Sequence, residues 1–337
     1  MNMNIYDHMV EMVSRTFALS IKNLPRTLRE AVGLSYLLFR VSDCVEDHAD
    51  MDAGRKAELL EIWEQVLQGD EVPTEFTDRI ADLDGGDPEV YVAKQAGDLI
   101  DYLHTMSPEL QGYIVDRCGR SALGMARWQR QGPFVDTVDE LDDYMHQVAG
   151  IVGYLMTDIY TWYYPSLDQK KDAMMPVSRQ VGLGLQTVNV IRGLRSDLAR
   201  GWMFVPKEYL DQVGITRQQF FEPEHEVQAM QVVNMLVQKA ERHLEYGLEY
   251  ISAFPHRLHQ VRLANIWPLF FAIKTLALSR DNVEVVRSEV KITRDDVSRI
   301  MRMTTLKGWS NRWLRRYYEH LNHGDGELQE TIDEQLL

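Results

Sequence analysis

Helical periodicity runs through almost all of this 337-residue chain, and strand-like alternation is scarce. In residues 28–47, "LREAVGLSYLLFRVSDCVED", apolar side chains recur every three and four positions. Residues 262–280, "RLANIWPLFFAIKTLALSR", are apolar almost all round, so this helix should be buried by other helices. The pattern predicts an all-α bundle of roughly a dozen helices, with a central apolar cavity between the most apolar of them.

The chain contains no fixed-period repeat, low-complexity tract or long linker that would divide it. We therefore expect one domain over residues 1–337, with residues 303–337 as a peripheral C-terminal helix and tail. Residues 306–321, "LKGWSNRWLRRYYEHL", gather basic and aromatic side chains. Two interpretations remain open for them: a closing helix packed on the bundle, or a peripheral contact with an anionic membrane surface.

Composition excludes several classes of protein. The net charge is −15 and no basic stripe is present, so nucleic-acid binding is not the main function. The only cysteines, Cys44 and Cys118, form no CxxC or His/Cys cluster, which argues against a zinc site and fits a reducing compartment. We see no apolar signal core and no uninterrupted apolar run near the ~20 residues of a membrane span. These features predict a cytoplasmic protein.

Three acids follow a helix that looks buried. Asp43, Glu46 and Asp47 are three and four residues apart, which places them on one side of that helix. Such a face suits Mg²⁺, which binds through one or two carboxylates and completes its shell with water and phosphate oxygens. Arg40, one turn earlier, suits bidentate binding of a phosphate group. The alternative is a solvated helix end.

A second polar helix face provides a candidate partner. In residues 185–201, "LQTVNVIRGLRSDLARG", Gln186, Asn189, Gly193 and Asp197 follow one another at steps of three, four and four. Asn189 and Asp197 therefore lie on one face, two turns apart. Arg192, Arg195 and Arg200 add positive charge. The alternative is a surface helix of mixed charge.

Several motifs in the same order resemble the squalene/phytoene synthase family of head-to-head prenyltransferases. The matching stretches are "SRTFALSIKNLPRTLREAVGLSYLLFRVSDCVED", "DDYMHQVAGIVG" and "LQTVNVIRGLRSDLARGWMFVP". Two others, "CGRSALGMARW" and "ANIWPLFFAIKTLAL", are more similar to the squalene branch than to the phytoene branch.

This resemblance implies a single-domain isoprenoid synthase bundle, two Mg²⁺-binding helices and a substrate such as farnesyl diphosphate. It also implies condensation to presqualene diphosphate and, with NADPH, reduction to squalene. NADPH would bind without a Rossmann motif, because "GLGLQ" is too short for a dinucleotide loop. The residues implied for catalysis are Tyr36, Arg40, Gln147 and Arg192. Those for substrate binding are Ser14, Arg15, Arg40, Gln186 and Arg192, and those for metal are Asp43, Glu46, Asp47, Asn189 and Asp197.

The chain departs from the family pattern in the second acidic motif. Gly193 and Ser196 stand where the family has acids, and Trp202 stands where it has arginine. Gln147 replaces a catalytic tyrosine, and Ala264 falls near the position of an expected aromatic residue, although Trp267 is one turn away. Two alternatives to squalene synthesis stay open: a class I terpene cyclase or diphosphate-releasing enzyme, with water at Gly193, and a non-catalytic prenyl-lipid-binding protein.

Overall fold

The computed structural model describes residues 3–323, except for the side chains of residues 3–5 and of Arg15. Within this range the chain is helical and forms no strand, which confirms the all-α prediction. The α-helices are α1 (Met3–Val13), α2 (Arg15–Lys22), α3 (Arg26–Asp47), α4 (Ala53–Gln68), α5 (Pro73–Arg79), α6 (Pro88–Lys94), α7 (Ala96–Leu103), α8 (Pro108–Gln131), α9 (Val138–Met145), α10 (Ile151–Tyr163), α11 (Lys171–Ala199), α12 (Lys207–Val213), α13 (Glu226–Ala253), α14 (His259–Ser279), α15 (Glu284–Arg287), α16 (Arg294–Lys307) and α17 (Asn311–His323). A π-helical turn, η1 (His146–Gly150), joins α9 to α10, and the 3-10 turns are η2 (Pro165–Lys170), η3 (Gln219–Phe221) and η4 (Pro223–His225).

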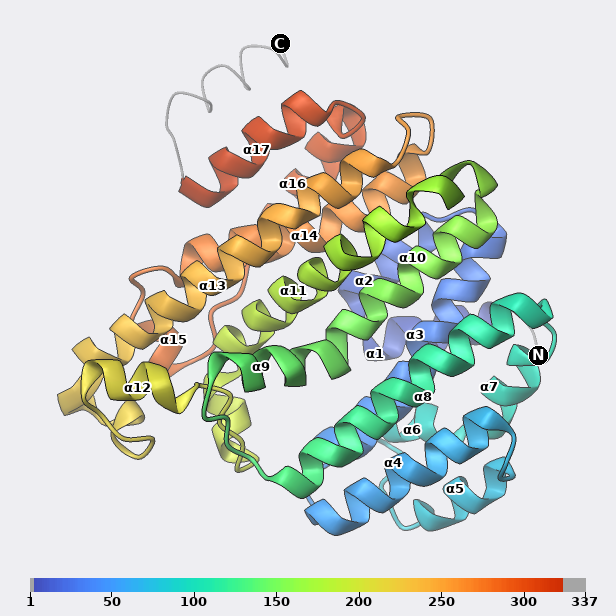
Figure 1. Ribbon diagram of the computed structural model, residues 1–337, viewed down its shortest axis with the longest axis horizontal. Helices are drawn as coiled ribbons and strands as arrows, with labels where there is room; N and C mark the ends of the chain where they lie inside the picture. The colour runs from blue at the N-terminus through green and yellow to red at the C-terminus, as the bar shows by residue number, and fades with distance from the viewer. Residues whose placement is uncertain (1–2, 324–337) are drawn as a thin grey trace.

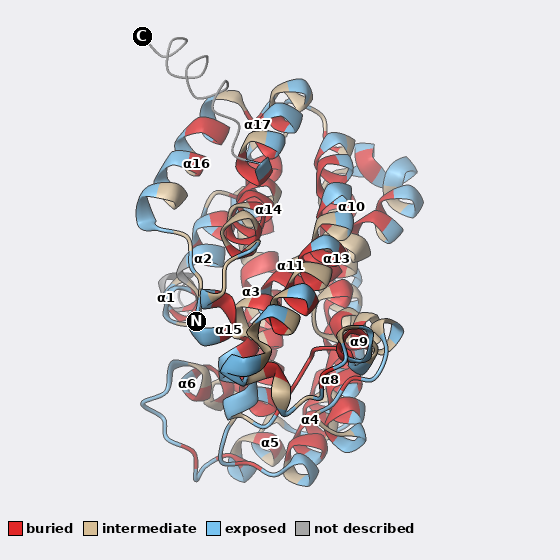
Figure 2. Ribbon diagram, turned by 90° about the vertical axis from the view of Figure 1, so that its left-hand side faces the viewer, coloured by how far each residue is buried: buried red, intermediate tan, exposed pale blue. Residues whose placement is uncertain are grey.

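The helices form two packed groups that meet at α10 and α11. In Figure 1, α11 runs between α10 and α13, while α4 lies alongside α8 at the opposite end of the molecule. One hydrophobic cluster draws mainly on α1 to α8 and α10, and the other on α9 and α11 to α17. Val148 of η1 packs against both clusters. Figure 2 shows buried residues on the inner helices, with exposed residues on the outer faces.

Two glycines bring the central helices unusually close together. A Cβ added to Gly153 of α10 would lie 2.3 Å from the backbone oxygen of Ser178 in α11. A Cβ added to Gly182 of α11 would lie 2.4 Å from the oxygen of Ala149 in η1. Backbones at this separation leave no space for a larger side chain at either glycine. The crossing therefore fixes the orientation of α11, and with it the direction in which its polar face points.

Helix α14 is the apolar helix that the sequence predicts to be buried. Among residues 3–323 it alone has the length and hydropathy of a membrane span, and 72% of its most apolar window is buried inside the bundle. The helix is not an uninterrupted apolar run, because it contains charged residues. Arg262 and Lys274 are its two charged residues. Its mean hydropathy stays as high as that of a membrane span despite them.

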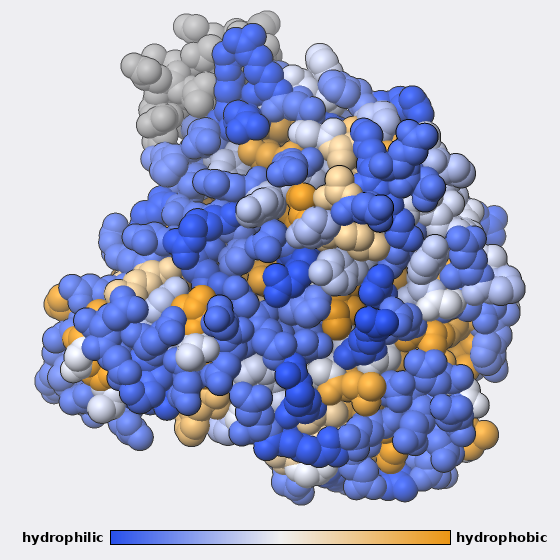
Figure 3. Space-filling model, viewed as in Figure 1, coloured by the Kyte–Doolittle hydropathy of each residue, from blue (hydrophilic) through white to orange (hydrophobic). Residues whose placement is uncertain are grey.

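The aromatic residues near the C-terminus mostly pack inward. Tyr317 and Tyr318 of α17 are buried, and Trp313 stacks on Tyr317 with ring centroids 4.7 Å apart. Trp309, in the turn before α17, is 54% exposed. On the face shown in Figure 3, hydrophobic residues occur only in small separate groups. Residues 324–337 of the predicted C-terminal tail lie outside the described residues.

Candidate active site

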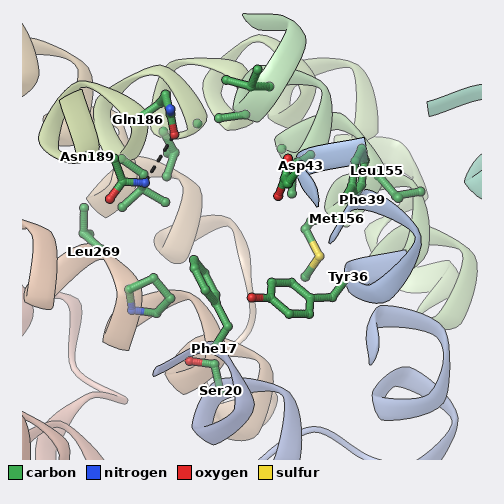
Figure 4. Close-up of a pocket in the computed structure, with 18 of the residues that line it drawn as sticks. Phe17, Ser20, Tyr36, Phe39, Asp43, Leu155, Met156, Gln186, Asn189 and Leu269 are labelled. Atoms are coloured by element: carbon green, nitrogen blue, oxygen red, sulfur yellow. Dashed lines mark hydrogen bonds between the residues drawn. The ribbon is translucent and has the colours of Figure 1, made fainter. Parts of the chain in front are cut away.

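A cavity of about 530 Å³ lies between α2, α3, α10, α11, α13 and α14. Its lining includes charged residues from α3 and α11 and apolar residues such as Leu155, Met156 and Leu269. In Figure 4, Asp43 lies across the space from Gln186 and Asn189 of α11. The structure therefore brings the two predicted polar helix faces to one cavity.

The acids of the first motif lie in the last turn of α3. Glu46 is buried, Asp43 is half-buried and Asp47 is exposed. Arg40 donates to Asp43 over 2.6 Å and pairs with Glu89 of α6. Burial raises the pKa of Asp43 to about 6, with Arg40 opposing this rise and the charge of Asp47 adding to it. The like charges of these acids oppose one another, so a bound cation near them would relieve their repulsion.

Glu46 provides a second indication that the acids fit a cation. Burial, together with the neighbouring charges of Asp47 and Asp43, raises the pKa of Glu46 well above its ordinary value. Its Oε1 atom is buried and has no hydrogen-bond partner among the described residues. A buried acceptor without a partner costs free energy unless a ligand satisfies it. The unpaired Oε1 of Glu46 thus faces the need for a ligand at the acidic end of α3.

We expect the affinity for Mg²⁺ to rise with pH until Asp43 is ionised. Below a pKa of about 6, a proton competes with the metal, so affinity should fall about tenfold per pH unit. Calorimetric titration with Mg²⁺ between about pH 5 and about pH 7 measures this dependence. A constant affinity across that range would contradict it. In the metal-free protein the same raised pKa means that ionising Asp43 opposes folding, so stability falls as the pH rises from the ordinary pKa of 3.8 to about 6.

The second polar face has fewer acids than the first. The amide of Asn189 donates to Gln186 over 3.2 Å, and both side chains line the cavity. Asp197 is 9% exposed and accepts a hydrogen bond of 2.6 Å from Arg200. Arg192 also lines the cavity and donates to Glu289 over 2.8 Å. Within residues 3–323, no three His, Cys, Asp or Glu side chains are grouped closely enough to form a ready metal centre.

The residues predicted to contact substrate are divided between two places. Tyr36 lines the cavity, where its ring lies 5.7 Å from that of Phe17. Ser14 does not line it, and its hydroxyl caps α2 by accepting a hydrogen bond of 3.1 Å from the Phe17 amide. Arg15 is the first residue of α2, and its side chain lies outside the described part of the structure.

Gln147 does not face the cavity, contrary to expectation. Its side chain fills the space above Gly124 of α8, where an added Cβ would lie 2.4 Å from Gln147 Oε1. Its amide also donates to Asp143 over 3.2 Å. Tyr144, one turn earlier, lines the cavity, as do Val148 and Ala149 directly after Gln147. The π-helical turn η1 begins between them, and a π-turn changes the direction of side chains relative to an α-helix.

Tyr144 belongs to an aromatic stack that the sequence analysis missed. Its ring stacks on Phe204 with centroids 4.4 Å apart, and Phe204 stacks on Trp202 at 5.3 Å. Burial and the nearby Glu46 carboxylate raise the pKa of Tyr144 well above its ordinary value, so its hydroxyl stays protonated. Trp202, which replaces the family arginine, thus supports a cavity wall. The motif "DDYMHQVAG", which the sequence shares with the family, contains Tyr144 and could have indicated that this tyrosine lies at the site.

Of the other predicted or missed residues, some line the cavity and some do not. Ala264 lines the cavity, whereas Trp267 is buried and donates to Thr304 over 3.0 Å, so it does not supply the missing aromatic. Glu89 and Glu289 pair with Arg40 and Arg192. No local sequence pattern pointed to these two acids, because they are distant in the chain from their partners.

Comparisons with known proteins agree with this geometry. The family pattern described as squalene/phytoene synthase matches residues 10–296. Squalene synthase BSS of Botryococcus braunii is 29% identical over 330 residues, covering 94% of this chain and 66% of that protein. Squalene synthase ERG9 of Saccharomyces cerevisiae is 30% identical over 311 residues, covering 89% of this chain and 67% of that protein. The chain thus spans about two-thirds of the length of these relatives.

A solved structure supports the fold over nearly the whole chain. The structure of TcSQS in complex with a ligand superposes with a TM-score of 0.80 at 24% identity. The superposition covers 95% of this chain and 90% of TcSQS. The predicted isoprenoid synthase fold is confirmed by this likeness. The chain belongs to the squalene/phytoene synthase family.

Proposed function

We propose that this protein is a Mg²⁺-dependent prenyltransferase that joins two molecules of farnesyl diphosphate head to head. The product would be presqualene diphosphate and, with NADPH, squalene. The observation that carries the proposal is the single cavity in which the α3 acids lie beside Arg40 and Arg192 and next to an apolar lining. Such a cavity suits a substrate with a diphosphate at one end and an isoprenoid chain at the other.

The charged residues would bind and stabilise the diphosphate. Arg40 and Arg192, now paired with carboxylates, have the planar geometry for bidentate contacts with phosphate oxygens. Asp43, Glu46 and Asp47 would hold Mg²⁺ from α3, with Asn189 and Asp197 as the predicted ligands on α11. Bound Mg²⁺ supplies positive charge that stabilises the departing diphosphate.

The apolar residues would protect the reacting carbons. Leu155, Met156 and Leu269 line the cavity and would exclude water from an allylic cation formed when the C–O electrons leave with diphosphate. Tyr36, whose hydroxyl points into the cavity in Figure 4, would orient the substrate there. The double bond of the second prenyl chain would then supply the electrons of the new C–C bond, and loss of a proton from the joined chains, to the released diphosphate or to solvent, would close the cyclopropane ring.

Product analysis with farnesyl diphosphate, Mg²⁺ and the whole protein tests the proposal. We expect presqualene diphosphate without NADPH and squalene with it, with hydrocarbons identified by mass spectrometry. Released diphosphate should accompany both. If the substrate binds but is not consumed, the prenyl-lipid-binding alternative replaces the enzyme proposal.

A terpene cyclase or diphosphate-releasing enzyme is the second candidate. The observation that favours it is the weakened second motif, in which Gly193 and Ser196 leave Asp197 as the one acid of that turn. A cyclic hydrocarbon or a prenyl alcohol formed from one substrate molecule would identify this function. The cytoplasmic location and the peripheral membrane contact stay predictions. Within residues 306–321, Trp309 is the exposed aromatic residue that such a contact would use.

A further inference from the structure

We propose that Arg200 is a built-in counter-cation that takes the place of a metal ion between α3 and the end of α11. Its guanidinium pairs with Asp47 of α3 and with Asp197 of α11, the latter over 2.6 Å. One side chain thus neutralises carboxylates from both acidic helices. The inference rests on the proposed function and adds to it, because it says that the acids of α3, rather than Asp197 of α11, bind the metal.

The planar guanidinium is suited to this position. Its two terminal nitrogens bond separately to the two acids, and the rigid fork of guanidinium donors suits carboxylates on two different helices. Arg200 lines the cavity and is 28% exposed at its side chain, while the Asp197 side chain is 12% exposed. A charge pair shielded from water is stronger than one on an open surface. The Asp197 half of the contact is therefore shielded inside the cavity wall, whereas Asp47, 46% exposed at its side chain, lies at its edge.

Gly193 shapes the position of Asp197. A Cβ added to Gly193 would lie 2.9 Å from Asp197 Oδ2 and 3.3 Å from its Cγ. The carboxylate of Asp197 thus lies over the space that an acid at position 193 would need. Gly193, where the family has an acid, and the Asp197–Arg200 pair belong to one local arrangement at the end of α11. In this arrangement Asp197, which the sequence predicts as a metal ligand, binds Arg200 instead, and Asn189 is left as the predicted ligand on α11.

The other cations near the acidic motif have partners of their own, so Arg200 is the one that pairs with Asp47. Lys56 donates to the backbone oxygen of Glu46 over 2.7 Å, so it does not compete with Arg200 for Asp47. Asp43 has its own partner in Arg40. Metal is therefore expected at Asp43 and Glu46, with the second oxygen of Asp47 available to it.

Counting bound Mn²⁺ by electron paramagnetic resonance, with inorganic diphosphate present, tests the inference without relying on activity. Arg200→Ala leaves Asp47 and Asp197 facing each other without a cation, and should bind about one additional Mn²⁺ per chain. Metal-free R200A should melt about 2–4 °C below the wild type, and Mn²⁺ should restore the difference. The same number of ions in wild type and R200A would overturn the proposal.

Two further variants make the result specific. Arg195→Ala removes the same charge from α11, but its guanidinium bonds to Val286 and stacks on Phe221, so its ion count should stay at the wild-type value. Asp197→Asn in the otherwise wild-type chain should also keep that count, because Asp197 is paired with Arg200 and binds no metal ion. An ion lost in D197N would overturn the proposal even if R200A failed to fold. Failure of prenyl transfer would change none of these counts, so the two proposals fail separately.

Discussion

Asp43→Asn should reduce the rate of farnesyl diphosphate consumption by about 10²–10³-fold. Asp43 lies in the cavity, is held by Arg40 and belongs to the acidic face that faces α11. An amide of the same shape keeps the packing but removes the negative charge that the metal requires. Released diphosphate measured at saturating substrate gives the rate, and Mg²⁺ titration should show weakened binding in the same variant.

Asp50→Asn is the matched control for that experiment. Asp50 lies three residues beyond α3, is exposed and does not line the cavity. The substitution changes the net charge by the same amount, so a general electrostatic effect would appear in both variants. We expect D50N to retain the wild-type rate. A D43N rate within about tenfold of wild type would remove Asp43 from the catalytic site.

Arg262→Met should lower the free energy of unfolding by about 3 kcal/mol or more. Arg262 is fully buried in α14 and donates to the backbone oxygens of Ile251, Phe254 and Gly308 at distances of 2.7 to 3.3 Å. It forms no salt bridge with a carboxylate in the described part of the chain. Methionine fills similar volume but leaves these carbonyl groups buried without a donor, which costs free energy for each.

Chemical unfolding monitored by circular dichroism measures this effect. The control is Arg257→Met, in the exposed turn before α14, which should change the free energy of unfolding by no more than about 0.5 kcal/mol. If R262M loses less than about 1 kcal/mol, water must reach the carbonyl groups in place of the guanidinium. Both variants keep the cavity residues, so activity per folded molecule should be unchanged.

The fold and one half of the site could be predicted from local patterns. The acids at Asp43, Glu46 and Asp47 are fixed by helical spacing, and α3 places that spacing on the cavity. Asn189 and Gln186 reach the same cavity for the same reason. A single period of about 3.6 residues per turn was sufficient to put each set on one face.

The rest depends on contacts that no local pattern encodes. Gln147 was expected to face the substrate, but the π-helical turn after Tyr144 and the close packing against Gly124 direct its side chain away. Glu89 and Glu289 reach their arginines from segments 49 and 97 residues distant. Arg200 was noted only as positive charge, since its two partners lie on different helices.

The close crossing of α10 and α11 limits how this cavity can evolve. Gly153 and Gly182 both line it, and at that crossing backbone meets backbone with no side chain between them. The width of the cavity there is set by main-chain atoms, so ordinary substitutions cannot widen it. Selection for a longer or shorter isoprenoid has room to act on the side chains of α2 and α14, such as Phe17, Ala264 and Leu269. Substitutions in α2 and α14 can thus change the shape of the cavity while its width at this crossing stays fixed.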